Sequence, residues 1–222
     1  MELRGLTVNF LGDSITEGCG VVDRKNCRYD NRLKEMCGIA RVNNYGIGGT
    51  RLAHQTKPSD NPRFDLCFCG RAYVMDTNAD LVVVYGGVND YLHGDAPIGK
   101  LGDITPATFH GGVYFLMNYL NENYKKKGKA VAFLTPARCF GHEKISGSPA
   151  KRPDAMSLVE YVKIIQKTAE IFDIPVFDMY NNLRLDPNEP EVKEKYTSDG
   201  LHFNDKGHAV IAERVKEFLE SL

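Results

Sequence analysis

The sequence lacks an excess of either charge, and it lacks any long apolar run. Its 222 residues carry 28 basic and 29 acidic side chains, which gives a formal charge of −1 at pH 7. Nucleic acids and anionic membrane surfaces require a basic face, so we expect neither as a partner. No apolar run approaches the ~20 residues that a membrane-spanning helix needs. With 42% hydrophobic and 26% charged residues, the composition is that of a globular domain rather than a disordered chain.

The N-terminal residues lack the features of a secretory signal. The apolar stretch at residues 8–11 is too short for the apolar region of a signal peptide, and it runs directly into a glycine-containing turn. We therefore expect a cytoplasmic protein. The six cysteines include no CxxC pair, since Cys67 and Cys69 are separated by a single residue, so no zinc site is expected. A chain long enough to bury its own core is expected to keep these thiols reduced.

Short apolar runs alternate along the chain with longer segments of helical periodicity. Strands are expected at residues 6–11, 41–47, 81–85, 130–134 and 175–177. Helices are expected at residues 28–37, 106–124, 157–172 and 205–219. This alternation predicts βαβ units and a largely parallel sheet, and no linker or repeat divides residues 1–222, so one domain is expected. The three lysines before Gly128 indicate the end of a helix rather than a binding patch.

Three long polar segments follow predicted strands, at residues 52–65, 91–105 and 136–153. Loops of this length in a compact domain usually have a function or are mobile. Ligands of open α/β sheets bind at the carboxyl ends of the strands. We therefore expect the three segments to converge on one rim around the functional site.

Ser14 lies where the first predicted strand meets a short helix, in the sequence Gly12-Asp13-Ser14. A serine at such a turn presents its hydroxyl above the sheet edge, beside backbone N–H groups that can hold an oxyanion, which suits a nucleophile. The alternative is a helix N-cap, with Glu17 completing a capping box. The segment is not GxSxG, and considered alone it favours the cap.

Two further clusters follow the second and third predicted strands. The glycines at residues 46–49 do not complete a GxGxxG fingerprint, because Arg51 stands where the last glycine is required, so nucleotide binding is disfavoured and a tight turn is the simpler interpretation. Asn89 can present an amide that donates two hydrogen bonds. An Asn-Asp turn formed with Asp90 is the alternative.

Asp199 and His202 lie three residues apart on one predicted loop before the last helix. This spacing lets the carboxylate bond to the imidazole and select its tautomer. Alternatively, His202 is a surface histidine, and Asn204 is the N-cap of the last helix. His208, inside that helix, is expected on the surface or partly packed.

Together, the four segments resemble the SGNH hydrolases, also called the GDSL esterase/lipase family. Ser14, Gly49 and Asn89 match the first three blocks of that family, and Asp199 to His202 match the last, in the family's order. The resemblance implies an α/β fold, namely a flavodoxin-like three-layer α/β/α sandwich with a five-stranded parallel sheet of order 2-1-3-4-5. Phe203 stands where the family often has proline, which bears on the shape of the pocket rather than on the mechanism.

The resemblance also implies the activity of a serine esterase. Ser14 is then the nucleophile, His202 its general base, and Asp199 the residue that orients His202. Ser14, Gly49 and Asn89 form the oxyanion hole. Neither a metal nor an organic cofactor is required.

The substrate is expected to be a small-molecule or oligosaccharide acyl ester. The rim segments carry many polar side chains and few large apolar ones, whereas a long-chain lipase needs an apolar groove. We therefore expect a short acyl group such as acetyl on a polar alcohol such as a sugar. Arg51, Asp13 and Phe203 are candidates for substrate contact, although Arg51 can equally form a surface salt bridge.

Several alternatives use the same residues. A lysophospholipase, a thioesterase or an acyltransferase shares the acyl-serine intermediate. The alternative that is not an enzyme is an inactive carbohydrate-binding module. Such a module needs no nucleophile, which argues against it here because all four residues are intact: Ser14, Asn89, Asp199 and His202. The sequence does not determine the oligomeric state.

Overall fold

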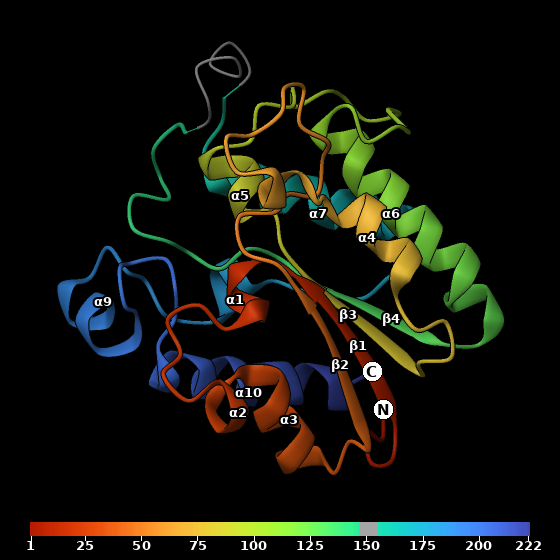
Figure 1. Ribbon diagram of the computed structural model, residues 1–222, viewed down its shortest axis with the longest axis vertical. Helices are drawn as coiled ribbons and strands as arrows, with labels where there is room; N and C mark the ends of the chain where they lie inside the picture. The colour runs from red at the N-terminus through yellow and green to blue at the C-terminus, as the bar shows by residue number, and fades with distance from the viewer. Residues whose placement is uncertain (147–154) are drawn as a thin grey trace.

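A parallel sheet lies between two layers of helices in the computed structural model, which describes residues 1–146 and 155–222 (Figure 1). The strand order is β2-β1-β3-β4-β5, and every pairing is parallel. The strands are β1 (Thr7–Gly12), β2 (Arg41–Gly46), β3 (Leu81–Tyr85), β4 (Ala130–Leu134) and β5 (Val176–Phe177). The expected flavodoxin-like sandwich and its strand order are therefore confirmed.

The central strand β3 is buried along its whole length because helices cover both faces of the sheet. Its residues Leu81, Val83 and Tyr85 contribute to one apolar cluster, and Val82 and Val84 to the other. Alternate side chains of β3 therefore point to opposite faces of the sheet and pack into the two cores.

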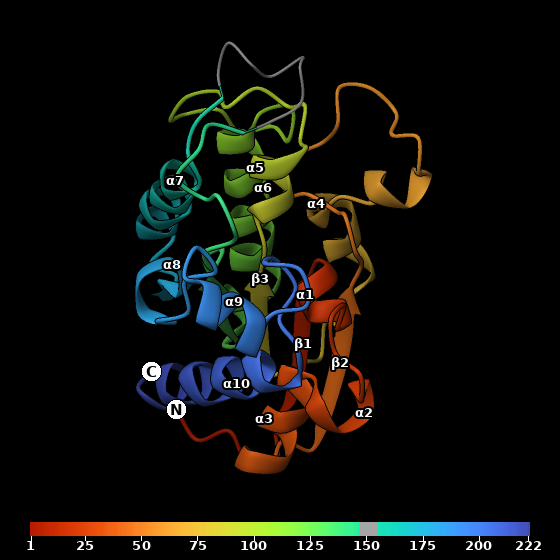
Figure 2. The ribbon, with the colours of Figure 1, turned by 90° about the vertical axis from the view of Figure 1, so that its left-hand side faces the viewer.

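Helices cover both faces of the sheet, as Figures 1 and 2 show. One face is covered by α3 (Tyr29–Cys37) and α10 (Asp205–Glu220), and the other by α4 (Phe68–Arg71), α6 (Phe109–Asn123) and α7 (Leu158–Ile171). The N-cap of α10 is Asn204, as the sequence suggested, and its side chain accepts hydrogen bonds from the N–H groups of Lys206 and Gly207.

Short elements complete the chain. These are α1 (Ser14–Glu17), α2 (Arg24–Cys27), η1 (Pro62–Asp65), η2 (Ala72–Val74), α5 (Val88–Leu92), η3 (Lys125–Lys127), α8 (Met179–Asn182) and α9 (Pro190–Tyr196). The lysine run forms η3 and ends at Gly128, which adopts a left-handed conformation with φ of 77°, so the predicted stop is confirmed. Neither α8 nor α9 was expected, because neither has an apolar period long enough to be recognised.

The loops at the carboxyl ends of the strands converge, as expected. The carboxylate of Asp95 accepts hydrogen bonds from the N–H groups of Thr56 and Lys57, which joins the second segment to the first. The hydroxyl of Tyr91 donates to the carbonyl of Lys144, which joins the second segment to the third. Residues 147–153 of the third segment lie outside the described residues.

His208 corrects an expectation. Its side chain is 0% exposed, it stacks on the ring of Tyr29 with centroids 5.8 Å apart, and its Nδ1 accepts the N–H of Tyr29 at 3.1 Å. Burial, together with the charges of Arg28 and Arg32, lowers the pKa of His208 to about 3. The expectation of a surface or partly packed histidine was wrong because this face of α10 packs against α3.

All six cysteines are free thiols. Among the helices that the structure describes, none combines the length and apolarity needed to cross a bilayer.

Candidate active site

Three side chains from opposite ends of the chain form a hydrogen-bonded series at the carboxyl edge of the sheet. The Oγ of Ser14 lies 3.0 Å from Nε2 of His202, and Nδ1 of His202 lies 2.7 Å from Oδ2 of Asp199. A carboxylate can only accept, so Nδ1 carries the proton and Nε2 presents a lone pair toward the hydroxyl of Ser14. This arrangement can take a proton from a serine as it attacks a carbonyl.

The register of the sheet explains why the serine stands at this edge. Gly12, the last residue of β1, pairs with Gly46 on one side and with Tyr85 on the other. The three strands therefore end at the same level, and the residues that follow each of them meet.

Ser14 is the first residue of α1 rather than its cap. The cap is Asp13, whose carboxylate accepts the N–H of Ile15 at 3.0 Å. Glu17 closes no capping box, because its carboxylate accepts the N–H of Gly48 at 2.6 Å. The alternative interpretation of Ser14 as an N-cap was therefore wrong, and its hydroxyl is available to His202.

Hydrogen bonds between neighbouring residues fix the shape of the loop that carries Asp199 and His202. One oxygen of Asp199 accepts the N–H groups of Leu201 and His202 at 2.9 and 2.8 Å, while the other bonds the imidazole. Partial burial opposes ionisation of Asp199, but the hydrogen bonds from His202 and Leu201 prevail and lower its pKa below the usual range. The carboxylate is therefore ionised at neutral pH, as the orientation of His202 requires.

The glycine loop after β2 lies against Ser14. A Cβ built on Gly48 would lie 3.5 Å from Cβ of Ser14, in ordinary contact with it, and 3.0 Å from Oε2 of Glu17. Gly49 has φ of +75°, and a side chain on it would overlap the ring of Phe64. Only glycine fits this position without strain and without overlap.

Asn89, in α5 after β3, is bonded to the residue that follows this glycine loop. Its Nδ2 donates to the carbonyl of Thr50 at 2.9 Å. The next residue, Asp90, accepts the N–H groups of Leu52 and Ala53 at 2.9 and 3.0 Å. Asn89 and Asp90 lie within α5 rather than in a simple turn, and each holds the backbone that follows Gly49.

Two structural contributors to the site escaped the sequence analysis. Asp90 was considered only as part of a turn. The buried guanidinium of Arg71 donates to the carbonyls of Gly12 and Tyr45 and to the hydroxyl of Thr50, which ties together the ends of β1 and β2. No motif surrounds Arg71, so only its position in space reveals this role.

The three residues expected to contact substrate have internal contacts. Arg51, Asp13 and Phe203 are 2%, 1% and 1% exposed. The guanidinium of Arg51 bonds His93 and the segment at residues 59–65, where it forms a salt bridge with the partly exposed Asp65. Phe203 packs in the apolar cluster beneath α10. Complete burial raises the pKa of Asp13 to about 6, against the opposing effect of the Ile15 N–H.

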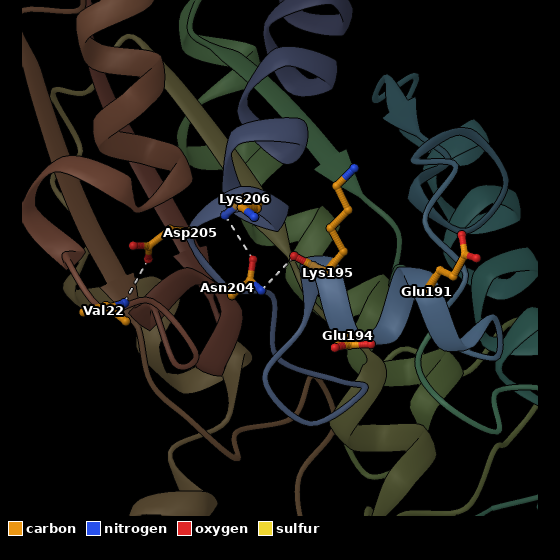
Figure 3. Close-up of a pocket in the computed structure, with 7 residues that line it drawn as sticks. All are labelled: Val22, Glu191, Glu194, Lys195, Asn204, Asp205 and Lys206. Atoms are coloured by element: carbon orange, nitrogen blue, oxygen red, sulfur yellow. Dashed lines mark hydrogen bonds between the residues drawn. The ribbon is translucent and has the colours of Figure 1, made fainter.

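A separate pocket lies between α9 and the start of α10 (Figure 3). Its lining residues are Val22, Glu191, Glu194, Lys195, Asn204, Asp205 and Lys206. Asn204 donates to the carbonyl of Lys195, and the carboxylate of Asp205 accepts the N–H of Val22. These polar groups hold the protein's own backbone, and neither Ser14 nor His202 lines this pocket.

The fold and the site together define a class. A parallel α/β sheet that presents a Ser–His–Asp series at its carboxyl edge is the architecture of an α/β serine hydrolase. The chain belongs to the GDSL-like lipase/acylhydrolase family, whose family model matches residues 10–210. It is therefore an ester-hydrolysing enzyme.

Solved structures share this fold. A protein from Lactobacillus plantarum is 26% identical, with a TM-score of 0.82 and coverage of 98% of each chain. An acetyl xylan esterase, AlAXEase, is 24% identical with a TM-score of 0.62, covering 96% of this chain and 98% of that one. A two-domain esterase active on acetylated mannans is 21% identical with a TM-score of 0.61, covering 99% of this chain and 50% of that one. No curated protein matches the chain.

Proposed function

We propose that the protein hydrolyses short-chain acyl esters, above all acetyl esters, of a polar alcohol such as a carbohydrate. The observation that carries the proposal is the hydrogen-bonded series from Ser14 through His202 to Asp199. Such a series has little purpose in a binding module, which needs no activated hydroxyl.

In the proposed reaction, Oγ of Ser14 forms a bond to the ester carbonyl carbon while Nε2 of His202 takes the hydroxyl proton. The carbonyl electron pair moves onto oxygen, and the N–H groups of Ser14 and Gly49 and Nδ2 of Asn89 stabilise that charge. The bond to the alcohol oxygen then breaks as His202 returns the proton to it. Water, activated by the same imidazole, releases the acid and regenerates Ser14.

The preference for a polar alcohol rests on the rim and on two similar structures. Charged side chains such as Lys57 and Arg63 lie on the exposed part of the first rim segment. The two esterases compared above carry names that refer to acetylated xylan and acetylated mannan. Both observations favour an acetylated carbohydrate.

One observation favours a second candidate, a thioesterase or lysophospholipase. Four large apolar side chains of the rim segments are exposed, more than the sequence analysis allowed for: Leu101, Ile104, Phe140 and Ile145. Exposed apolar side chains on the rim can contact a longer acyl chain.

The decisive experiment compares p-nitrophenyl acetate, p-nitrophenyl octanoate and acetylated xylo- and manno-oligosaccharides as substrates. We expect higher kcat/KM for acetyl than for octanoyl, release of acetate from an oligosaccharide, and a fluorophosphonate adduct on Ser14. Ser14→Ala should lose all three, while Ser221→Ala, near the C-terminus, should keep them. Faster octanoyl turnover would favour the second candidate, and the absence of both turnover and adduct would favour a binding module.

A further inference from the structure

The side chains of Arg51, His93 and Asn89 form a second hydrogen-bonded series, distinct from the one that holds Ser14. An Nη of Arg51 lies 2.9 Å from Nδ1 of His93, and Nε2 of His93 lies 3.1 Å from Oδ1 of Asn89. The series ends at the carbonyl of Thr50, 2.9 Å from Nδ2 of Asn89. It therefore runs from a buried cation to the amide proposed for the oxyanion hole.

The direction of each bond follows from the chemistry of the arginine. A guanidinium can only donate, so Nδ1 of His93 must accept and carries no proton. The proton of the neutral imidazole is then on Nε2, which donates to Asn89. The atom of Asn89 that faces His93 is therefore its carbonyl oxygen, and the amide nitrogen faces the opposite way.

This direction determines what Asn89 presents to a substrate. One N–H of Nδ2 bonds the carbonyl of Thr50, and the second is left to donate to a developing oxyanion. If the amide were turned by 180°, its carbonyl would face the oxyanion and repel it. The rotamer of Asn89 alone does not distinguish these two orientations. The carbonyl of Thr50 and the N–H of His93 favour the same one, from the two ends of the carboxamide.

The cation at the start of the series is itself firmly held. One Nη of Arg51 donates to the hydroxyl of Ser59 at 3.0 Å and to the carbonyl of Phe64 at 2.8 Å, and it pairs with Asp65 at 3.3 Å. Arg51 is buried, and these contacts come from the rim segment that covers Gly49. The orientation of the oxyanion amide is thereby linked to the first rim segment.

We propose that His93 and Arg51 are positioning residues that orient the carboxamide of Asn89 for oxyanion binding. The inference rests on the proposed function, because it needs Asn89 to act in the oxyanion hole. A purely structural role is the competing explanation, since the ring of His93 also lies near that of Phe64, with centroids 5.9 Å apart.

A double-mutant cycle on p-nitrophenyl acetate separates the two explanations. We expect His93→Leu to lower kcat ten- to a hundredfold, about the effect of losing most of one oxyanion donor. KM should change by less than about threefold, because the lost interaction forms in the transition state. In the Asn89→Ala background, His93→Leu should have almost no further effect, since its partner is gone. Equal losses of kcat in both backgrounds, or no loss in either, would overturn the proposal.

Further variants control the cycle. His93→Gln, which keeps a donor near Nε2, should recover most of the lost kcat, whereas His54→Leu, at an exposed histidine of the same rim, should have no effect. If His93→Leu lowers the Tm strongly, His93→Asn replaces it in the cycle, because it keeps an acceptor for Arg51 and loses only the link to Asn89. A failure of the proposed function gives a different result: Ser14→Ala then retains full activity, whatever the His93 variants do. If only Asn89→Ala retains full activity, the esterase proposal stands and the inference about His93 is overturned.

Discussion

The carboxylate of Asp90 accepts a hydrogen bond from the backbone N–H of Leu52 at 2.9 Å, and its other oxygen accepts that of Ala53 at 3.0 Å. These bonds connect α5, which follows β3, to the backbone just after the glycine loop. They hold the backbone beyond Gly49 at a fixed distance from Asn89, so two proposed oxyanion donors share one support.

Asp90→Ala should therefore lower both stability and activity. Two buried N–H groups lose their acceptor, which costs about 3 kcal/mol of unfolding free energy, and kcat should fall because Gly49 moves. Urea denaturation and ester turnover measure the two effects. Asp95→Ala is the matched control, since Asp95 also accepts two backbone N–H groups, but those of Thr56 and Lys57, farther along the first rim segment than Leu52 and Ala53. If both variants lose kcat equally, Asp90 has no special link to the site.

Asp199→Asn should lower kcat by about 10²–10⁴-fold with little effect on folding. The new amide can donate to Nδ1 of His202, which moves the imidazole proton to Nε2 and removes the lone pair that faces Ser14. Steady-state kinetics and a thermal melt test this expectation. Asp173→Asn, at an exposed aspartate, should behave as the parent. Full activity in Asp199→Asn would mean that another group orients His202.

Gly49→Ala should lower the stability of the protein more than the same substitution at Gly102, and it should also lower kcat. The alanine would have to adopt φ of +75°, which L residues rarely do, and its methyl group would overlap the ring of Phe64. Gly102→Ala provides the control, because Gly102 has φ of +101° and no atom lies within 4 Å of an added Cβ. We expect Gly102→Ala to cost about 1 kcal/mol of stability through backbone strain alone. Gly49→Ala should cost more and should also reduce kcat, and a loss limited to stability would argue against an oxyanion role for its N–H.

Stability should fall in mild acid because of His208. Its pKa is lowered to about 3 in the folded protein, whereas an unfolded histidine titrates near 6.5. Between these values the unfolded chain binds a proton that the folded protein does not. The contribution of His208 to the free energy of unfolding is therefore fully present above about pH 6.5 and is lost as the pH falls toward 3. Between pH 7 and pH 5, the titration of His208 should lower the free energy of unfolding by about 2 kcal/mol.

Urea denaturation of the parent and of His208→Asn at these two pH values isolates the effect. Asparagine keeps an acceptor for the N–H of Tyr29 but cannot be protonated, so its stability should depend less on pH by that amount. The buried Asp13, with its raised pKa, acts in the opposite direction, but it is present in both proteins and cancels in the comparison. Identical pH dependence would mean that His208 is solvated in solution.

Much of the fold could be predicted because its signals are local. The strands at residues 81–85 and 130–134 were predicted with the observed boundaries, since continuous apolar runs of that length are typical of strands covered on both faces. The strand expected at residues 175–177 has only two paired residues, and the helix expected from residue 28 begins at Tyr29 after a separate α2. Boundaries of this kind depend on neighbouring elements rather than on local pattern.

The sequence by itself determined the class of chemistry and one contact of the site. Asp199 and His202 are three residues apart, so a single loop can bring the carboxylate to the imidazole. The approach of Ser14 to His202, across 188 residues, exists only because the ends of β1 and of the α9–α10 connection lie at one edge of the sheet. The tertiary structure also decided that Arg51 lies buried against His93 and that His208 is buried and neutral, because each depends on groups from distant segments that no local spacing specifies.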